Sequence, residues 1–298
     1  MSALALVQSL SRPGGQSPND DRANGKAGTA SGHAWVVDGA TGVADRSYIS
    51  SSDSDAAWLA ARLDQLFADL PQTSEPLRVA MRRIIGRVRD DYLIETSLSS
   101  VPDYAIPSAA ALYCGWEQSG HRVHVRFSSL GDCSAIVREA SGLLHIVGDL
   151  SNGGSDADML DRFGAFHGDR SPTAEAELRD FLRARRERMN KPDGYWVFSI
   201  APEAASHLSE CALCLRSPAD MMMMTDGFAR LIDHFQAYTP ETLIDAALTR
   251  GLEPLYEELR ALEAADPDCE TAPRVKSEDD ASAVLVRLEA TGKGADAA

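Results

Sequence analysis

The sequence predicts an α+β protein built as a four-layer α-β-β-α sandwich, in which two antiparallel sheets are flanked by helix pairs. Two observations support this prediction. Short apolar or alternating runs, which are typical of strands, recur along the whole chain. Longer segments with helical spacing of their apolar residues occur as two pairs, and each pair can cover the outer face of one sheet.

The strands are expected where these short runs end at turn residues. They lie in the first ten residues, which could instead form a short helix, and at 34–37, 123–128, 134–138, 143–147, 195–200, 221–225 and 283–288. Residues 123–128 alternate apolar and polar side chains, and we expect this strand to pair with the two strands that follow it. The four consecutive residues Met221–Met224 are typical of a buried strand.

The first helix pair lies between the second and third of these strands. Apolar residues recur at helical spacing over 58–70, and Pro71 ends that helix. The same spacing predicts a second helix over 77–92, with Ser74 as its capping residue. Together these two helices are expected to cover one sheet.

The second helix pair lies near the end of the chain. Thr239 and Pro240 are expected to open one helix, and Gly251 to end it. Pro254 opens a second helix that runs to about residue 262. These helices are expected to cover the other sheet.

Composition limits the classes of partner and the cellular setting. The 298 residues carry a formal net charge of −16, which would repel nucleic acid, and the basic run Arg183–Arg188 is typical of a solvated helix face. No run reaches the ~18 apolar residues that span a bilayer, and the start lacks the basic region of a signal peptide. Five cysteines, an odd number, fit a reducing compartment. We therefore expect a cytoplasmic monomer without membrane or nucleic-acid contacts.

Aspartates stand where several expected strands end. They are Asp20 and Asp21, Asp38, Asp132, Asp226, and Asp279 and Asp280. Any one of them could simply cap a turn. If folding gathers them at one sheet rim, each pair of charges ~4 Å apart would repel by ~4 kcal/mol at an effective dielectric near 20, unless cations neutralised them. Oxygen ligands suit Mg²⁺ or Mn²⁺ better than zinc. The set therefore predicts a divalent metal centre.

The order of these motifs resembles a known family. The segments NDD, VVDGATG, GDC, TDGF and EDDAS follow one another as in the PPM, or PP2C, family of metal-dependent serine/threonine phosphatases. The resemblance runs from about Ser17 to Leu288. It implies one phosphatase domain over 1–290, with a flap-like loop at about 149–171 near the active site. The tail at 291–298 is expected to be disordered. The resemblance also implies a phosphoprotein substrate and two bound Mn²⁺ or Mg²⁺ ions, with a third site in addition.

The resemblance assigns roles to single residues. Asp38 would bridge the two metal ions, Gly39 would offer its carbonyl oxygen to one of them, and Asp226 with Asp279 would complete the shell of the other. The remaining ligands would be Asp20 and Asp21 at the second ion, directly or through water, and Asp132 at the third, weaker site.

Three positions depart from the family pattern. Thr41 replaces a glycine of DGxGG, Cys133 replaces the serine of GDS, and Gln16 stands where the family has an arginine that binds phosphate. A neutral amide cannot replace a bidentate guanidinium. Arg22, or else Arg12 or Arg46, could supply the cation, although each is equally typical of a solvated arginine.

Two further groups could contact the substrate. His33, five residues before Asp38, could protonate the leaving group, although a lone histidine beside a strand is more often structural. His167 and Arg170, in the flap-like loop, could face a phosphate, and exposed loop residues without a role are the alternative.

The metal hypothesis favours hydrolysis of phosphoserine and phosphothreonine by a water held between two cations. No protein nucleophile is required, and no cysteine is followed by the C-x5-R arginine of cysteine phosphatases. Two alternatives stay open: a PP2C-like regulatory or binding module with weak catalysis, which the three departures permit, and a phosphatase of a small phosphorylated metabolite.

Overall fold

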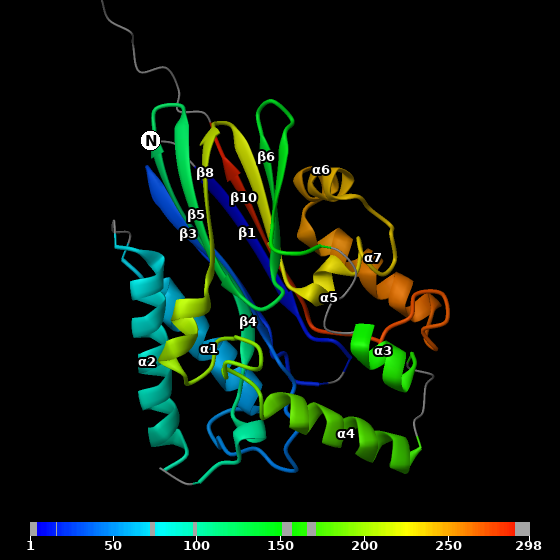
Figure 1. Cartoon of the computed structure of the whole chain (residues 1–298). Helices are drawn as coiled ribbons and strands as arrows, with labels where there is room; N and C mark the ends of the chain where they lie inside the picture. Colours follow the sequence, from blue (N-terminus) through cyan, green and yellow to red (C-terminus); the bar gives the residue numbers. More distant parts are fainter. Residues whose placement is uncertain are drawn as a thin grey trace, which may run out of the picture.

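The computed structural model describes residues 5–15, 17–71, 75–97, 100–150, 157–165 and 171–289. Within these ranges the chain forms two five-stranded antiparallel sheets that pack face to face, with helices on both outer faces (Figure 1). The predicted four-layer α-β-β-α sandwich is confirmed.

Each sheet collects strands from distant parts of the sequence. The first has the order β1 (Ala5–Arg12), β10 (Ala281–Leu288), β9 (Ala219–Met224), β6 (Ser134–Glu139) and β7 (Leu144–Val147). The second has the order β2 (Arg22–Ala27), β3 (Ser31–Gly39), β4 (Ala109–Ser119), β5 (Arg122–Leu130) and β8 (Ser209–Arg216).

Two groups of helices cover the sheets. Helices α1 (Asp55–Ala68) and α2 (Leu77–Glu95) pack on the second sheet, and α5 (Asp226–Ala229), α6 (Pro240–Arg250) and α7 (Leu252–Ala265) pack on the first. Helices α3 (Ala157–Phe163) and α4 (Pro172–Arg186) lie beyond one end of the sandwich (Figure 1). Single 3₁₀ turns occupy Asp103–Ala105 and Pro202–His207.

Alternation along β3 decides which of its side chains can reach the space between the sheets. Ala34 and Val36 pack in the core between the sheets, whereas Trp35 and Val37 pack against α1 and α2. Asp38 has the parity of Val36, so it points to the inner side at the end of the sandwich. The methionines of β9 alternate in the same way, between the sheets and against the outer helices.

Two strand predictions are wrong. The strand at 123–128, now β5, pairs with β4 and β8, because both of its edges are taken within its own sheet. The following hairpin, β6 and β7, belongs to the other sheet. Residues 195–200 form no strand, since only isolated bridges at Tyr195 and Phe198 pair them with other segments.

The helix predictions mostly hold. Thr239 caps α6 with its side chain, Pro240 is the first residue of that helix, and Gly251 ends it. Helix α2 begins after Pro76, and the expected cap Ser74 lies outside the described residues. The region 149–171 is not a loop throughout, because it contains α3. His167, Arg170 and the tail at 291–298 lie outside the described residues.

All five cysteines are free thiols. Cys211 and Cys214 lie three residues apart on β8, so their side chains point to opposite faces and cannot share one metal ion. Among the described helices, none combines the length and the apolar character needed to cross a lipid bilayer.

Candidate active site

The aspartate motifs meet at one end of the sandwich. Six of the seven residues interpreted as metal ligands line one cleft of about 580 Å³: Asp21, Asp38, Gly39, Asp132, Asp226 and Asp279. They come from the ends of β3 and β5, from the start of α5 after β9, and from the segments before β2 and β10. Since these strands belong to both sheets, the cleft exists only when the two sheets are packed together.

Folding makes two of these carboxyl groups hard to ionise. Burial raises the pKa of Asp38 well above its ordinary value, and the charges of Asp226, Asp21 and Asp132 raise it further. Burial likewise raises the pKa of Asp21, whose side chain is 1% exposed, and Asp280 and Asp226 add to the effect. The carboxyl groups are therefore close enough to repel one another.

A buried threonine holds Asp21 in place. Thr225 Oγ1 donates a hydrogen bond to Asp21 Oδ2 at 2.9 Å. The same oxygen accepts a hydrogen bond from the backbone N–H of Ser282, in β10, at 3.0 Å. One side chain thus ties Asp21 to two neighbouring strands of the first sheet.

Asp20 does not line the cleft, which corrects its interpretation as a direct metal ligand. Its Oδ1 accepts a hydrogen bond from Ser54 Oγ at 2.5 Å. Ser54 caps α1 by accepting a hydrogen bond from the backbone N–H of Ala57 at 2.8 Å. A carboxylate is favourable at a helix N-terminus. Asp20 therefore joins α1 to the segment before β2, and only Asp21 of this pair lines the cleft.

Asp279 has two cationic partners. Lys276 Nζ lies 3.0 Å from its Oδ1, and Arg230 Nη2 lies 3.1 Å from its Oδ2. Burial favours the neutral form of Asp279, but Lys276 and Arg230 outweigh burial and hold its pKa below the ordinary value. Arg230 is itself buried and pairs with Glu263 of α7 at 2.8 Å. Asp279 is thus fixed by a chain of ion pairs that begins in the helix layer.

The segment that carries Asp20 and Asp21 is held between β3 and Asp280. Asp280 Oδ2 accepts a hydrogen bond from the backbone N–H of Asp20 at 2.6 Å, and its Oδ1 accepts one from that of Gly14 at 2.7 Å. On the other side, a Cβ at Gly39 would lie 2.3 Å from the carbonyl oxygen of Asp20. Glycine at this position lets β3 approach the segment closely.

Helix α4 contributes an arginine that sequence reasoning missed. Arg186 lines the cleft, and its Nη2 donates hydrogen bonds to the carbonyl oxygens of Ala40 at 3.0 Å and Thr41 at 2.7 Å. These carbonyl groups directly follow Asp38 and Gly39 in the chain. The guanidinium group is therefore held beside the DG motif.

A second arginine of the same run fastens α4 to the next residues of this loop. Arg183 Nε donates a hydrogen bond to the carbonyl oxygen of Val43 at 2.9 Å, and its Nη2 pairs with Asp45 at 2.7 Å. The interpretation of the basic run as a solvated face is thus wrong for Arg183 and Arg186. Their spacing of three residues, a helix-face signal, could have indicated a shared contact.

The phosphate ligand expected at Arg22 is also corrected. Arg22 Nη1 donates hydrogen bonds to the carbonyl oxygens of Asn19 at 2.9 Å and Asp21 at 2.5 Å, and the residue does not line the cleft. Gln16 lies outside the described residues. The other two candidate cations have partners elsewhere, Arg12 on Glu253 and Arg46 over the ring of Tyr48.

His33 is a core residue and not a cleft residue. It lies five residues from Asp38 on the same strand, so the two side chains point to opposite faces. Its Nδ1 lies 3.0 Å from the hydroxyl group of Tyr113, and its ring packs edge-on against Trp35. Burial and the charge of Lys26 lower its pKa to about 4, so the ring is neutral at pH 7. The interpretation of His33 as a substrate contact or proton donor is corrected.

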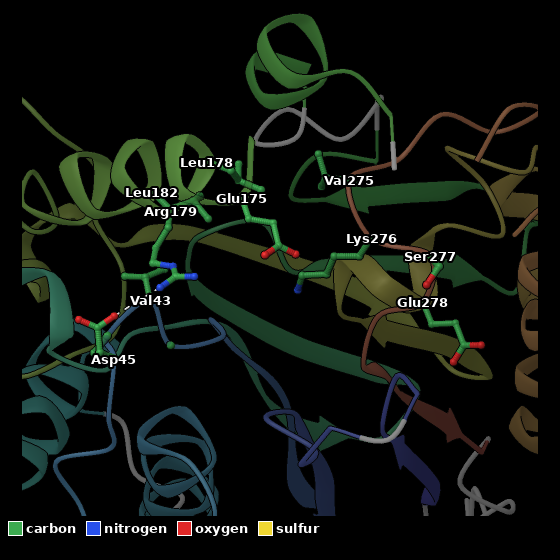
Figure 2. Close-up of a pocket in the computed structure, with 12 residues that line it drawn as sticks. Val43, Asp45, Glu175, Leu178, Arg179, Leu182, Val275, Lys276, Ser277 and Glu278 are labelled. Carbon is green, nitrogen blue, oxygen red and sulfur yellow. Dashed lines mark hydrogen bonds and ion pairs between the residues drawn. The ribbon is translucent and has the colours of Figure 1, made fainter. Parts of the chain in front are cut away.

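A second hollow of about 720 Å³ continues from the cleft, between α4 and the loops at 42–45 and 275–278 (Figure 2). Both are lined by Val43, Leu178, Leu182, Val275 and Lys276. Figure 2 shows Glu175 and Lys276 pointing into this space from opposite sides. The cleft is therefore one end of a longer depression whose wall is α4.

The donor set of the cleft suits a hard divalent cation. Asp21 and Asp38 have no basic side chain within ion-pair distance among the described residues, and their repulsion is relieved when a cation binds between them. Within the same ranges, no three His, Cys, Asp or Glu side chains already stand in a metal-binding arrangement. Asp279, with its two cationic partners, fits least well, and the other carboxylates would have to move closer together.

Comparison with known proteins identifies the fold. A scan against family models finds no match, and neither does a search of curated proteins. Among solved structures, the Mycobacterium tuberculosis serine/threonine phosphatase PstP/Ppp has a TM-score of 0.54 at 14% identity, over 96% of this chain and 99% of that chain.

Two further structures agree. The S. agalactiae serine/threonine phosphatase has a TM-score of 0.52 at 15% identity, over 96% of this chain and 100% of that chain. RsbX in complex with magnesium has a TM-score of 0.51 at 13% identity, over 96% of each chain. The chain therefore has the fold of PP2C-type serine/threonine phosphatases.

Proposed function

We propose that this chain is a Mn²⁺- or Mg²⁺-dependent phosphatase that hydrolyses phosphoserine and phosphothreonine in proteins. One observation carries the proposal: Asp21, Asp38 and Asp226 meet in a cleft where they raise the pKa of Asp21 and Asp38. Carboxylates that are held close together despite their mutual repulsion are typical of a cation-binding site. The shared fold with serine/threonine phosphatases supports the substrate class.

The residues that would hold the ions are Asp21, Asp38, Asp226 and the carbonyl group of Gly39, with Asp132 at a third, weaker site. When bound, the ions supply an activated water and neutralise charge on the phosphoryl oxygens. The hydrogen bond from Thr225 orients Asp21 within this set, and Asp279 beside the set is fixed by its own ion pairs.

A covalent route through cysteine is disfavoured. Cys133 is the thiol nearest the acidic cluster in the sequence, and it is 1% exposed. Burial, together with the charges of Asp38 and Asp132, raises its pKa well above the ordinary value. The thiol therefore stays protonated at neutral pH, and only the thiolate is nucleophilic.

One observation favours a second candidate, a phosphoprotein-binding module with little turnover. Asp279, which the resemblance assigns to a metal ion, is engaged by Lys276 and Arg230. Metal binding there must compete with two cations of the chain itself. A site weakened in this way could bind phosphorylated segments more readily than it hydrolyses them.

The assay that separates these functions uses purified protein with p-nitrophenyl phosphate, a phosphothreonine peptide and sugar phosphates. We expect turnover of the peptide with Mn²⁺, loss of that turnover in EDTA, and no turnover in Asp38→Asn. Peptide binding without turnover would support the binding module. Turnover of sugar phosphates but not of the peptide would overturn the protein-phosphatase proposal.

A further inference from the structure

Arg186 is a partly buried guanidinium group with only part of its hydrogen-bonding capacity in use. It is the last residue of α4, and its Nη2 donates to the carbonyl oxygens of Ala40 and Thr41. A guanidinium group carries five N–H donors in a planar fork. Its Nε and Nη1 make no hydrogen bond or ion pair with the described part of the chain.

Three other basic residues that line the cleft have carboxylate partners. Lys276 pairs with Asp279, Arg230 pairs with both Asp279 and Glu263, and His234 lies 2.8 Å from Asp233. Arg186 has no carboxylate within 4.0 Å among the described residues. The charge of Asp20 acts on it from farther away. A partly desolvated charge without a direct ion-pair partner is unfavourable, and an anion that enters the cleft would relieve it.

Arg186 is also held where an anion would matter. Its Nη2 is fixed by the carbonyl groups of the two residues that follow Gly39, so its position is coupled to the end of β3 and to Asp38. Anchoring through Nη2 leaves three N–H donors, one on Nε and two on Nη1. The two donors of Nη1 can point to oxygens of a phosphate group, and hydrogen bonds between a guanidinium group and phosphate are charge-assisted.

We propose that Arg186 binds the phosphate group of the substrate and supplies, from helix α4, the cationic contact that Gln16 cannot provide. The inference rests on the proposed function, because it places a phosphate monoester in the cleft. The last turn of helix α4 would then hold the phosphate group in position relative to Asp38. Arg183, one turn earlier, would serve only to fasten α4 to the loop at 42–45.

The test compares matched variants of these two arginines. Arg186→Gln and Arg183→Gln each remove a guanidinium group that binds carbonyl oxygens of the same loop, but only Arg186 lines the cleft. In the Asp38→Asn background, binding of a fluorescein-labelled phosphothreonine peptide is measured by fluorescence anisotropy, with its unphosphorylated twin as the reference. We expect Arg186→Gln to weaken binding of the phosphorylated peptide about 10- to 100-fold, and Arg183→Gln to change it less than about threefold.

Lysine variants test the same point without removing the charge. Arg186→Lys loses the planar fork, so we expect an intermediate loss of binding, whereas Arg183→Lys should bind as the parent does. Circular dichroism establishes that each variant is folded. If either Arg186 variant binds the phosphorylated peptide as its Arg183 counterpart does, the proposal is overturned.

Turnover in the otherwise native chain separates this inference from the proposed function. We expect Arg186→Gln to raise the KM for the phosphothreonine peptide and the inhibition constant for inorganic phosphate by similar factors. A native chain that turns over the peptide but shows no such change in Arg186→Gln would refute the role of Arg186 alone. A native chain without turnover, whose phosphopeptide binding still depends on Arg186, would refute the enzyme and keep the phosphate contact.

Discussion

At the level of single residues, the acidic cluster is a place where stability and proposed chemistry oppose each other. Asp38 is buried beside Asp226, Asp21 and Asp132, and all of these raise its pKa. No basic side chain in the described part of the chain lies within ion-pair distance of Asp38, and Lys276 acts on its charge only from farther away. A residue that weakens the metal-free fold and is useful only with a cation is typical of a functional site.

Asp38→Asn should therefore raise stability while it removes activity. Asparagine has the same shape without the charge, and each pKa unit of elevation that is removed is worth about 1.4 kcal/mol. In EDTA at pH 8 we expect the Tm to rise by about 2–4 °C for each kcal/mol gained in the free energy of unfolding, measured by differential scanning fluorimetry. Mn²⁺-dependent turnover should fall at least about 100-fold.

A matched control shows whether this effect belongs to the cluster. Asp45 is a carboxylate of the following loop that is 70% exposed in its side chain and is paired with arginines, so Asp45→Asn should not raise the Tm. A wild-type rate in Asp38→Asn, or a Tm rise of equal size in both variants, would show that the cluster is not the strained centre described above.

The difference in stability between Asp38→Asn and the native chain should depend on pH. An aspartate whose folded pKa is raised above its unfolded value of about 3.9 binds protons more tightly in the folded state. Its contribution to stability is fully present below about pH 4 and is lost as the pH rises through the folded pKa. Without metal, the two proteins should thus have equal Tm near pH 4, and the variant's advantage should grow toward pH 8.

This comparison cancels the titrating groups that lie away from the acidic cluster. Because the pKa of His33 is lowered to about 4, its protonation destabilises the fold as the pH falls below about 6.5. This effect is equal in both proteins. Parallel Tm curves in EDTA over this range would mean that the Asp38 carboxyl group is not perturbed.

Sequence reasoning reached the residues that motifs mark and missed those that only the fold brings together. The aspartates could be found because each lies at the end of a short strand or within two residues of one. The partners of Arg186 and Thr225 could not be found, because Thr41 and Asp21 are 145 and 204 residues away in the chain. His33 was misjudged because nearness in sequence was weighed before the alternation of β3, which places it on the wrong face.

At the level of elements, the approach of β3 to the segment before β2 sets the geometry of the cleft. Gly39→Ala would place a Cβ 2.3 Å from the carbonyl oxygen of Asp20. Asp280 holds this residue through its backbone N–H, and Ser54 holds it through its side chain. We expect a loss of about 1–3 kcal/mol in the free energy of unfolding, measured by urea denaturation. Mn²⁺-dependent turnover should fall with it, because Asp21 would shift relative to Asp38.

Gly42→Ala is the matched control for this substitution. It lies three residues further on, and a Cβ there meets nothing within 4 Å. Its effect on the free energy of unfolding should stay within about 0.5 kcal/mol. Equal losses in both variants would indicate that any substitution near the end of β3 is harmful. The close approach at Gly39 would then not be the cause.

The elements that were missed share one property: their patterns do not resemble a strand with one buried face. β2 is an exposed edge strand with few apolar residues, and β4 is buried along nearly its whole length, so neither alternates. β8 is exposed or half-buried at all but one of its positions. β5 was predicted to pair with the hairpin that follows it in the sequence. Instead, the turn at Gly131 leads the chain into the other sheet.

At the level of the whole molecule, the cleft lies where the two sheets end together, so occupancy of the site should couple the sheets. Asp38 and Asp132 lie at the ends of strands of one sheet, and Asp226 and Asp279 adjoin strands of the other. A ligand that binds only the folded state stabilises it by RT ln(1 + [L]/Kd), which is about 2.7 kcal/mol at 100 times Kd. A net charge of −16 adds a general attraction for cations that salt can screen.

Mn²⁺ should therefore raise the Tm of the native chain by about 5–10 °C at saturation, measured by differential scanning fluorimetry against EDTA. Asp38→Asn should lose most of this shift, whereas Asp45→Asn should keep it. Because nonspecific attraction is screened and site binding is less so, the shift should persist in about 0.3 M KCl. A shift of the same size in Asp38→Asn, or one that vanishes with salt, would mean that Mn²⁺ acts on the acidic surface at large and not between the sheets.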